Sequence, residues 1–380
     1  MKRVLLLSTV HPPTDSRIMY KIAPSLARHY HVSCALPGLN ASDWPAFQAI
    51  QLPKFERLVS RLLFAHPVVL FKCLRLRPDI VHIFVPELLP VAFIFQWLGT
   101  RVIYEVQENL FKKFEIKKYN NHLIFRKLFI FFDKLARRRF HCIFTDDAYL
   151  AEYKALAKPF SVIHNYVSLP VIDALAHTRE HARVPEFFYL GVVSPERCLD
   201  TMIAAMALLK TRLSAFHLHL FGPVRISTED LEQIEGYAAV KDHLTFHGYT
   251  DLKTALRRAG RAVAGIALLK PVADYPESFP TKLFEYMALK LPVITSDFPL
   301  YRPVVDNAAC GFCISPDDPS ALCEKLEQLI NNPQLRNRMG GNGRNAAEMT
   351  YNWASEEARL LSFYNDMLCH DTAHAGSVTL

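Results

Sequence analysis

The sequence predicts an α/β protein made of two halves, each built on a doubly wound parallel sheet. Three observations support this prediction. Short apolar runs of strand length alternate with segments whose apolar residues recur at helical spacing, as in βαβ units. The alternation stops once, in a polar stretch at residues 171–185, and then starts again. The length of 380 residues suits two domains better than one.

The first half, residues 1–170, is expected to hold six strands. Val4–Thr9 is a continuous apolar run that ends at a Pro turn, which is typical of a buried strand in a parallel sheet. Arg17–His29 is predicted to be a helix, because its apolar residues share one face. Further strands are predicted at Val32–Leu36, Ile80–Phe84, Val102–Val106, Cys142–Thr145 and Val162–His164.

The second half, residues 186–348, follows a linker at 171–185 and repeats the pattern. Its strands are predicted at Phe187–Leu190, His217–Phe221, Leu244–Phe246, Ala264–Leu268 and Val293–Thr295. Helices are predicted at Asp200–Lys210 and Thr281–Leu289. Sheets of this kind bind ligands at the carboxyl ends of their strands, so a cleft between the two halves is the expected active site.

The composition excludes several classes of protein. Hydrophobic residues make up 51% and charged residues 21%, so the chain can bury a core and is not a disordered protein. The apolar runs are all shorter than 18 residues, which argues against a membrane span. Met1–Leu7 lacks the apolar length and cleavage site of a signal peptide, and a buried first strand is expected instead. The eight cysteines are expected to be reduced, buried thiols of a cytoplasmic protein, because the close pair Cys310 and Cys313 has no second pair at zinc spacing.

The net charge of +7 is concentrated in one segment. Lys112–Arg139 holds ten Lys/Arg against two acidic residues and also contains a run of apolar and aromatic side chains. Such a segment suits a helix lying on an anionic membrane surface, but it also suits a core-facing helix with a solvated basic face. A weaker basic stretch covers Lys54–Arg77. Nucleic acid is not expected as a partner, since no nucleic-acid-binding motif is present.

Glu277–Ala288 is the most informative segment for chemistry. Pro280 suits the start of a helix, which places Glu277 in the preceding loop and Glu285 inside the helix. Free N–H groups at the helix start, together with Lys282, could hold a phosphate between two carboxylates that address hydroxyl groups. The alternative is an ordinary amphipathic helix with solvated charges, and the spacing alone does not separate the two interpretations.

This segment, Glu277-x7-Glu285 followed by Tyr286-Met287-Ala288, resembles the E-x7-E signature of retaining family-4 glycosyltransferases of the GT-B fold. The resemblance extends over residues 4–330 in the family's order. It includes the strand–loop Phe188–Arg197, the strand and Gly turn His219–Pro223, the loop Phe246–Tyr249 and the opening His11–Arg17.

The resemblance implies a nucleotide-sugar-binding C-terminal domain and an acceptor-binding N-terminal domain. It also implies that residues 349–368 form a crossover helix on the N-terminal domain, followed by a tail at 369–380. Glu277 would contact the donor sugar, Glu285 the ribose, and Arg197 and Lys282 the diphosphate. Other donor-side residues would be Ser278, Phe279, Pro280, Gly222 and Tyr249, with Gln107 also near the sugar. The acceptor-side candidates are His11, Asp15 and Arg17, although a structural Asp15–Arg17 pair is an equal alternative.

The same resemblance implies retention of anomeric configuration, with the leaving phosphate helping to deprotonate the acceptor. No metal or other cofactor is expected, and no two Asp lie two positions apart as a D-x-D metal motif requires. The donor is expected to be UDP- or GDP-linked. The acceptor is expected to be a lipid-linked or envelope glycan, used at the inner face of the plasma membrane, because the basic–apolar stretch 112–139 would dock at a membrane. A small soluble acceptor is the alternative.

Three positions depart from the family pattern. Gln107 stands where many members have a His, and it cannot carry a proton. Met202 replaces a Lys five residues after the phosphate-binding Arg, so Lys282 is expected to supply the missing charge. Cys198 replaces the Gly that usually follows this Arg. These departures favour, as a rival interpretation, an inactive or regulatory protein that binds sugar nucleotides.

Overall fold

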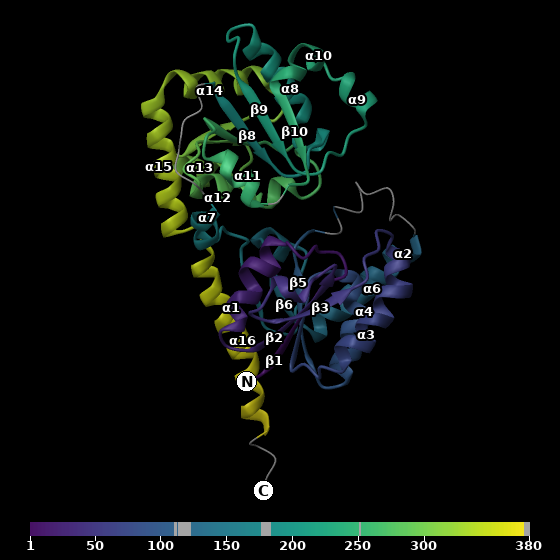
Figure 1. The fold of residues 1–380 in the computed structure, drawn as a ribbon. Helices are drawn as coiled ribbons and strands as arrows, with labels where there is room; N and C mark the ends of the chain where they lie inside the picture. Colours follow the sequence, from purple (N-terminus) through teal and green to yellow (C-terminus); the bar gives the residue numbers. More distant parts are fainter. Residues whose placement is uncertain (110–111, 113–122, 176–183, 251, 376–380) are drawn as a thin grey trace. The chain divides into compact units, whose positions relative to one another are not determined.

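The computed structural model describes residues 1–109, 112, 123–175, 184–250 and 252–375 (Figure 1). The chain divides into two compact units. Unit 1 comprises Met1–Asn165 and Trp353–Leu380, and unit 2 comprises Tyr166–Asn352. Each unit has its own parallel sheet and its own hydrophobic core.

Unit 1 contains a seven-stranded sheet in the order β3-β2-β1-β4-β5-β6-β7, with every pair parallel. This order is that of a doubly wound sheet. The strands are β1 Arg3–Leu7, β2 His31–Pro37, β3 Gln48–Leu52, β4 Ile80–Ile83, β5 Arg101–Val106, β6 His141–Phe144 and β7 Phe160–Val162.

Side chains of each central strand alternate between two helical layers. Leu5 and Leu7 of β1 face a core shared with α3, α4 and α6, whereas Val4 and Leu6 face a core shared with α1 and α16. The helices are the π-helical turn η1 Ile18–Ile22, α1 Ala23–Ala27, η2 Ala41–Asp43, α2 Leu58–Ser60, η3 Arg61–Ala65, α3 His66–Leu74, η4 Pro86–Leu88, α4 Leu89–Trp97, α6 Leu123–Arg139, η6 Asp147–Ala151 and α16 Trp353–Ala375.

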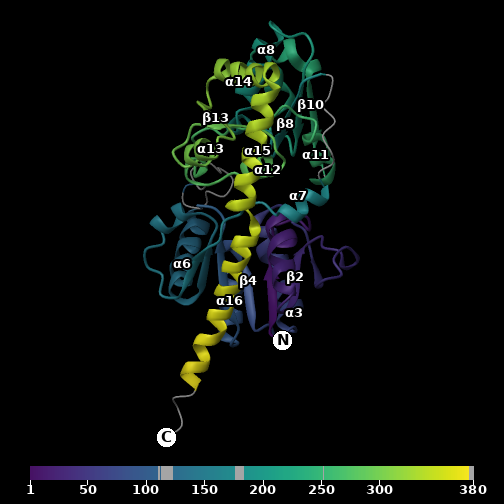
Figure 2. The same cartoon turned by 90° about the vertical axis from the view of Figure 1, so that its left-hand side faces the viewer.

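The last helix, α16, is part of unit 1 although it follows unit 2 in the sequence. Figure 2 shows it running along the sheet of unit 1. Trp353 Nε1 donates to Ser25 Oγ at 3.0 Å, and Tyr30 Oη donates to Asn365 Oδ1 at 2.8 Å. Leu360 and Tyr364 are fully buried in the same core as β1. The helix therefore completes one layer of the unit.

Unit 2 contains a six-stranded parallel sheet in the order β10-β9-β8-β11-β12-β13. The strands are β8 Glu186–Leu190, β9 His217–Phe221, β10 Leu244–Gly248, β11 Ala264–Ala267, β12 Val293–Ser296 and β13 Gly311–Ile314. The helices are α7 Leu169–Leu175, η7 Pro195–Arg197, α8 Leu199–Lys210, α9 Thr228–Glu232, α10 Tyr237–Val240, η8 Lys241–His243, α11 Leu252–Ala259, η9 Tyr275–Glu277, α12 Thr281–Ala288, α13 Arg302–Ala308, α14 Pro319–Asn331 and α15 Pro333–Met349.

The predicted α/β class with two doubly wound sheets is confirmed, but two strands were not predicted. Both β3 and β13 lie at a sheet edge. β3 mixes glutamines with apolar residues, and β13 is short and begins with Gly311, so neither shows the apolar run of a central strand. The segment predicted as a linker begins within α7, and residues 176–183 of it lie outside the described residues. Much of the basic segment before α6 also lies outside them.

Replacing Leu360 with Ala is expected to destabilise unit 1. Leu360 is fully buried on α16, and loss of a buried Leu side chain costs about 2–5 kcal/mol because a cavity remains. The free energy of unfolding in urea measures the effect. Leu361→Ala, at a partly buried position on the same helix, serves as the control and should cost clearly less. Equal losses in the two variants would mean that α16 does not complete the core.

Candidate functional site

Two glycines bring the carboxyl ends of β8 and β9 close together. Gly191 and Gly222 have φ angles of +139° and +134°, and a Cβ atom on Gly222 would lie 2.0 Å from the carbonyl oxygen of Gly191. The N–H of Gly191 donates to the carbonyl of Phe221 at 2.8 Å. Only glycine fits so close a backbone approach. The backbone at Gly191 and Gly222, called the glycine floor here, therefore lies without side chains at the carboxyl ends of β8 and β9.

Lys282 and Arg197 lie together beside this floor. A Cβ atom built on Gly191 would be 3.4 Å from Lys282 Nζ and 3.5 Å from Arg197 Nη1. Lys282 is only 4% exposed, and its Nζ has no hydrogen-bond partner among the described residues. Its ammonium group lies 3.8 Å from the ring centroid of Tyr189, a cation–π distance. Two cationic side chains, one of them unpaired, therefore converge on one point.

Burial lowers the pKa of Lys282 well below that of a free lysine, and the positive charge of Arg197 lowers it further. An anion bound between the two side chains would offset both effects, because it would supply the missing opposite charge. The convergence of the two side chains and the lowered pKa of Lys282 both indicate an anion site. The two positive side chains and the nearby start of α12 suit a phosphate group.

Tyr286 holds α12 in the position that brings Lys282 to this site. Its hydroxyl accepts the N–H of Leu190 at 2.9 Å. Its ring packs where a side chain on Gly265 would stand, since a Cβ atom there would lie 2.4 Å from the ring. Lys282 precedes Tyr286 by one helical turn on the same side of α12, so anchoring one places the other.

The two glutamates of the E-x7-E segment occupy the expected structural positions. Glu277 ends the short helical turn η9, Pro280 caps α12, and Glu285 lies within α12 near the charge of Lys282. Both carboxylates are half-buried. Ser278 and Phe279 form the connection, in which Ser278 Oγ donates to the carbonyl of Asp274 at 2.9 Å. Gly222 lies in the floor, and Tyr249 is exposed after β10.

The unusual residues Cys198 and Met202 have structural explanations. Cys198 has a φ of +59°, a left-handed conformation that favours the Gly usual at this position. Met202 is fully buried in the core beneath α8. A lysine at that buried position would need a charge partner of its own. The lysine that lies beside Arg197 is Lys282 instead.

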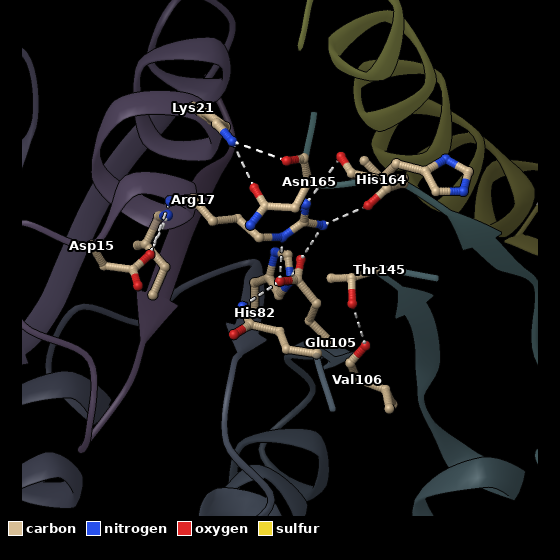
Figure 3. A network of polar contacts seen from close by, with 12 residues as sticks. Asp15, Arg17, Lys21, His82, Glu105, Val106, Thr145, His164 and Asn165 are labelled. Carbon is tan, nitrogen blue, oxygen red and sulfur yellow. Dashed lines mark hydrogen bonds and ion pairs between the residues drawn. The ribbon is translucent and has the colours of Figure 1, made fainter. Parts of the chain in front are cut away.

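Unit 1 contains a separate buried polar network (Figure 3). Arg17 Nε and Nη2 donate to the two carboxylate oxygens of Glu105 at 2.7 and 3.2 Å. Gln107 Nε2 donates to Glu105 Oε1 at 2.6 Å, and His82 Nε2 lies 3.3 Å from Glu105 Oε2. Although burial acts in the opposite direction, Arg17 and His82 hold the pKa of Glu105 well below its usual range. Glu105 is therefore a charged anchor for the amide of Gln107.

The alternative of an Asp15–Arg17 ion pair is wrong. Arg17 pairs with Glu105 instead, and it also donates to the carbonyl groups of Ile163 and His164. Asp15 accepts the backbone N–H groups of Arg17 and Ile18 at 3.0 and 2.8 Å, so it caps the following helix. With Arg17 only 3% exposed, its geometry favours a structural role over contact with an acceptor.

Other polar residues gather at the carboxyl ends of β1 and β4 in unit 1. His11 Nδ1 lies 2.8 Å from Ser8 Oγ. Arg61 donates to both carboxylate oxygens of Glu87, at 2.8 and 2.9 Å, and Thr9 Oγ1 donates to the same carboxylate. The sequence analysis did not single out Glu87 or Arg61, because they are 26 residues apart and neither belongs to a motif. The acceptor-side roles of His11 and Asp15 stay predictions.

Comparison with known families bears on unit 2 first. Residues 176–346 match the family model described as "Glycosyl transferases group 1". Unit 2 is a glycosyl transferases group 1 domain. The match covers all the donor-side candidates of unit 2 and confirms the resemblance to family-4 glycosyltransferases found in the sequence.

Individual relatives agree with this family. The capsular polysaccharide biosynthesis glycosyltransferase CapM of Staphylococcus aureus is 36% identical over 92 residues, which are 24% of either chain. The chain aligns with about a quarter to a half of the length of the curated relatives that it matches.

Solved structures match over nearly the whole chain. Sucrose-phosphate synthase from Thermosynechococcus elongatus has a TM-score of 0.77 at 17% identity, covering 97% of this chain and 100% of that one. HepE from Anabaena, solved in complex with UDP and glucose, has a TM-score of 0.74 at 13% identity, covering 96% and 100%. At these identities the matches establish the fold, and the predicted GT-B fold of the group 1 glycosyltransferases is confirmed.

Replacing Lys282 with Met is expected to stabilise the ligand-free protein at neutral pH. An unsatisfied buried polar group costs about 1–3 kcal/mol, and Met keeps the apolar contacts of the side chain. Because the folded-state pKa of Lys282 is lowered, unfolding takes up a proton there, and stability due to this residue rises with pH.

Urea unfolding of both proteins between pH 6 and 9 tests this expectation. The wild-type protein should gain more stability than the variant as the pH rises. Lys210→Met, at an exposed position on α8, is the control and should change neither stability nor its pH dependence. A Lys282→Met protein less stable than wild type across this range would contradict the assignment of an unpaired buried amine.

Proposed function

We propose that this protein is a glycosyltransferase that moves a sugar from a nucleoside-diphosphate sugar to a hydroxyl of an acceptor. The observation that carries the proposal is the unpaired, buried amine of Lys282 beside Arg197 at the glycine floor of unit 2. A site with two converging cationic side chains, one of which has no hydrogen-bond partner among the described residues, suits a diphosphate. The two glutamates of the same segment suit the neutral hydroxyls of a sugar and a ribose.

The proposed reaction retains the anomeric configuration and needs no metal. The bond between the anomeric carbon and the diphosphate oxygen breaks, and a bond from that carbon to the acceptor oxygen forms on the same face. The leaving diphosphate takes the acceptor's proton. Arg197 and Lys282 would stabilise the negative charge that develops on the diphosphate, while Glu277 orients the sugar and Glu285 the ribose. The E-x7-E segment supports these roles.

Binding of a nucleotide panel tests the donor site directly. UDP, GDP, ADP and CMP would each be added with and without magnesium, and the unfolding midpoint measured. A ligand at 100 times its dissociation constant adds about 2.7 kcal/mol of stability. We expect UDP or GDP to raise the midpoint without metal, and HepE, solved with UDP, favours UDP. No shift with any diphosphate would contradict the proposal.

Replacing Glu277 with Gln is expected to abolish sugar transfer while leaving the fold and diphosphate binding intact. Glu277 is half-buried in a loop, so the substitution removes charge without opening a core cavity. The measurement is turnover with the sugar nucleotide that the wild-type protein uses. Glu229→Gln, exposed on α9, is the matched control and should keep full turnover. Full turnover of Glu277→Gln would overturn the assigned role.

The proposed acceptor is a lipid-linked or envelope glycan at an anionic membrane. One helical face of unit 1, formed by α3, α4 and α6 and called the apolar–basic face here, supports this choice. The helix α4 contacts both neighbours (Figure 1). Exposed apolar side chains on it are Leu63 and Phe64 of η3, Phe71, Ile94, Trp97, Leu98, Leu128 and Phe131. Trp97 is 88% exposed.

The charges of the apolar–basic face are positive where they are exposed. Exposed basic residues on or next to its helices are Lys72, Arg75, Arg77, Arg126, Lys127, Lys134, Arg138 and Arg139. The acidic residue of α6, Asp133, is buried and pairs with Arg137 and Tyr153. An aromatic residue at full exposure among cations suits the headgroup region of an anionic bilayer. No helix among the described residues is long and apolar enough to span a membrane.

Replacing Trp97 and Phe131 with Ser is expected to weaken membrane binding. Each apolar side chain that leaves water contributes about 1.5–3 kcal/mol, so loss of both should reduce flotation strongly. The assay is flotation with vesicles of phosphatidylglycerol and phosphatidylcholine at low and high salt. Met349→Ser, which removes an exposed apolar side chain of unit 2, is the control. Wild-type binding should fall at high salt.

Absence of wild-type binding at low salt would contradict the membrane proposal and favour a soluble acceptor.

A second function, binding of a sugar nucleotide without turnover, is favoured by one observation. The amide nitrogen of Gln107 is bonded to Glu105, where many relatives have a titratable His. Diphosphate binding without transfer to any acceptor tested would support that function.

A further inference from the structure

A buried tyrosine from a different element holds the loop that carries Glu277. The loop consists of η9 and Ser278, between β11 and α12. Tyr301 lies after β12, at the start of α13. Its hydroxyl oxygen is 2.5 Å from the carbonyl oxygen of Tyr275 and 2.9 Å from that of Ser278. These two carbonyl groups flank Glu277, so one hydroxyl bridges the backbone on both sides of the glutamate.

The surroundings of Tyr301 make this contact a fixed one. The side chain is fully buried and packs with Phe298 and Leu269, while its ring stacks near Phe279 with centroids 6.1 Å apart. The ring cannot move without disturbing this apolar cluster. The hydroxyl is therefore held at one place, and the loop backbone is held against it.

The backbone hydrogen bonds within the loop are local ones. It belongs to no strand, and its short-range bonds run back to residues just before it, as from the N–H of Glu277 to the carbonyl of Asp274 at 3.0 Å. Ala273, just before the loop, has a φ of +50°, a strained conformation for a residue with a side chain. Such a backbone keeps its shape only where neighbouring structure enforces it.

We propose that Tyr301 is a positioning residue for Glu277. Its hydroxyl fixes the peptide groups on either side of the glutamate and so sets where the carboxylate meets the donor sugar. The inference rests on the proposed function, because it takes Glu277 as the sugar contact. A supporting group of this kind determines activity through the geometry of the residue that it holds.

The diphosphate site has a different anchor. Lys282 is placed by α12, which Tyr286 ties to Leu190, and Arg197 belongs to η7. The Tyr286–Leu190 contact does not involve Tyr301. Arg197 does meet the loop, since its Cζ lies 5.5 Å from the centroid of the Tyr275 ring, but Tyr301 holds the carbonyl group of Tyr275 and not that ring. Loss of the Tyr301 hydroxyl should therefore disturb recognition of the sugar while leaving recognition of the diphosphate intact, whereas general unfolding of unit 2 would weaken both.

Tyr301→Phe is the test, because it removes only the hydroxyl and keeps the packed ring. Binding of UDP, UDP-glucose, GDP and GDP-mannose to the wild type and the variant is measured by calorimetry, and kcat and KM are measured with the sugar nucleotide that supports transfer. We expect kcat to fall about 10- to 100-fold, as for loss of other supporting hydrogen bonds. Affinity for the free diphosphate should stay unchanged, and the extra affinity due to the sugar should fall.

Tyr153→Phe is the matched control. Tyr153 is also buried, and its hydroxyl donates to Asp133 in unit 1 at 2.9 Å. This variant should keep the kcat and the sugar preference of the wild type. Hydrogen exchange provides a second measurement that needs no ligand. Amides of residues 274–279 should exchange faster in Tyr301→Phe, while those of α12 should be unchanged.

Each outcome separates this inference from the proposed function. Wild-type kcat and sugar preference in Tyr301→Phe would overturn the inference and leave the function standing. An equal loss of affinity for diphosphates and sugar nucleotides would show a merely structural role and also overturn it. If the wild type binds none of the four nucleotides, the proposed function fails. Unchanged amide hydrogen exchange over residues 274–279 in Tyr301→Phe would then show that Tyr301 does not fix the loop, and would overturn the inference as well.

Discussion

The buried amine of Lys282 is the constraint on which the structure of unit 2 depends. A lysine with no hydrogen-bond partner is costly, and a fold keeps one only if the surrounding elements force it into place. Tyr286 ties the helix to β8, Gly265 leaves room for the tyrosine ring, and the amine lies beside Gly191. The sheet order, the glycines and the Tyr286–Leu190 contact together place the amine of Lys282 beside Gly191 and Arg197. At that point the amine of Lys282 has no hydrogen-bond partner in the part of the chain that the structure describes.

Unit 1 handles a buried charge in the opposite way. Arg17 and His82 lie against the buried carboxylate of Glu105 inside the unit (Figure 3). The amide of Gln107 donates to the same carboxylate. A buried pair of this kind adds little net stability, since desolvation offsets most of the attraction. What it contributes is a defined orientation for Gln107 and for the end of β7, where Arg17 donates to two carbonyl groups. Unit 2 has a buried amine without a hydrogen-bond partner among the described residues. Unit 1 pairs its buried charged groups with one another and so fixes their geometry.

The outer helices of unit 1 show a third arrangement of charge. In α6 the acidic residue turns inward to Arg137 and Tyr153, while most of the lysines and arginines stay at the surface beside Leu128 and Phe131. These exposed apolar side chains beside cations are the observation behind the proposed membrane contact. The core-facing interpretation is confirmed for one side of α6, since Ala136 lies in the core, and the membrane interpretation stays a prediction.

Local pattern was enough to determine the α/β class, the central strands and the E-x7-E segment, because strand alternation and helix starts depend on residues close together in the chain. The partners of the key side chains could not be found that way. Arg17 and Glu105 are 88 residues apart, and Lys282 meets Gly191 only when α12 packs on β8. The edge strands β3 and β13 were missed for a related reason, since their pairing rather than their composition makes them strands. Periodicity records which face of an element is buried, but only packing decides which other element covers that face.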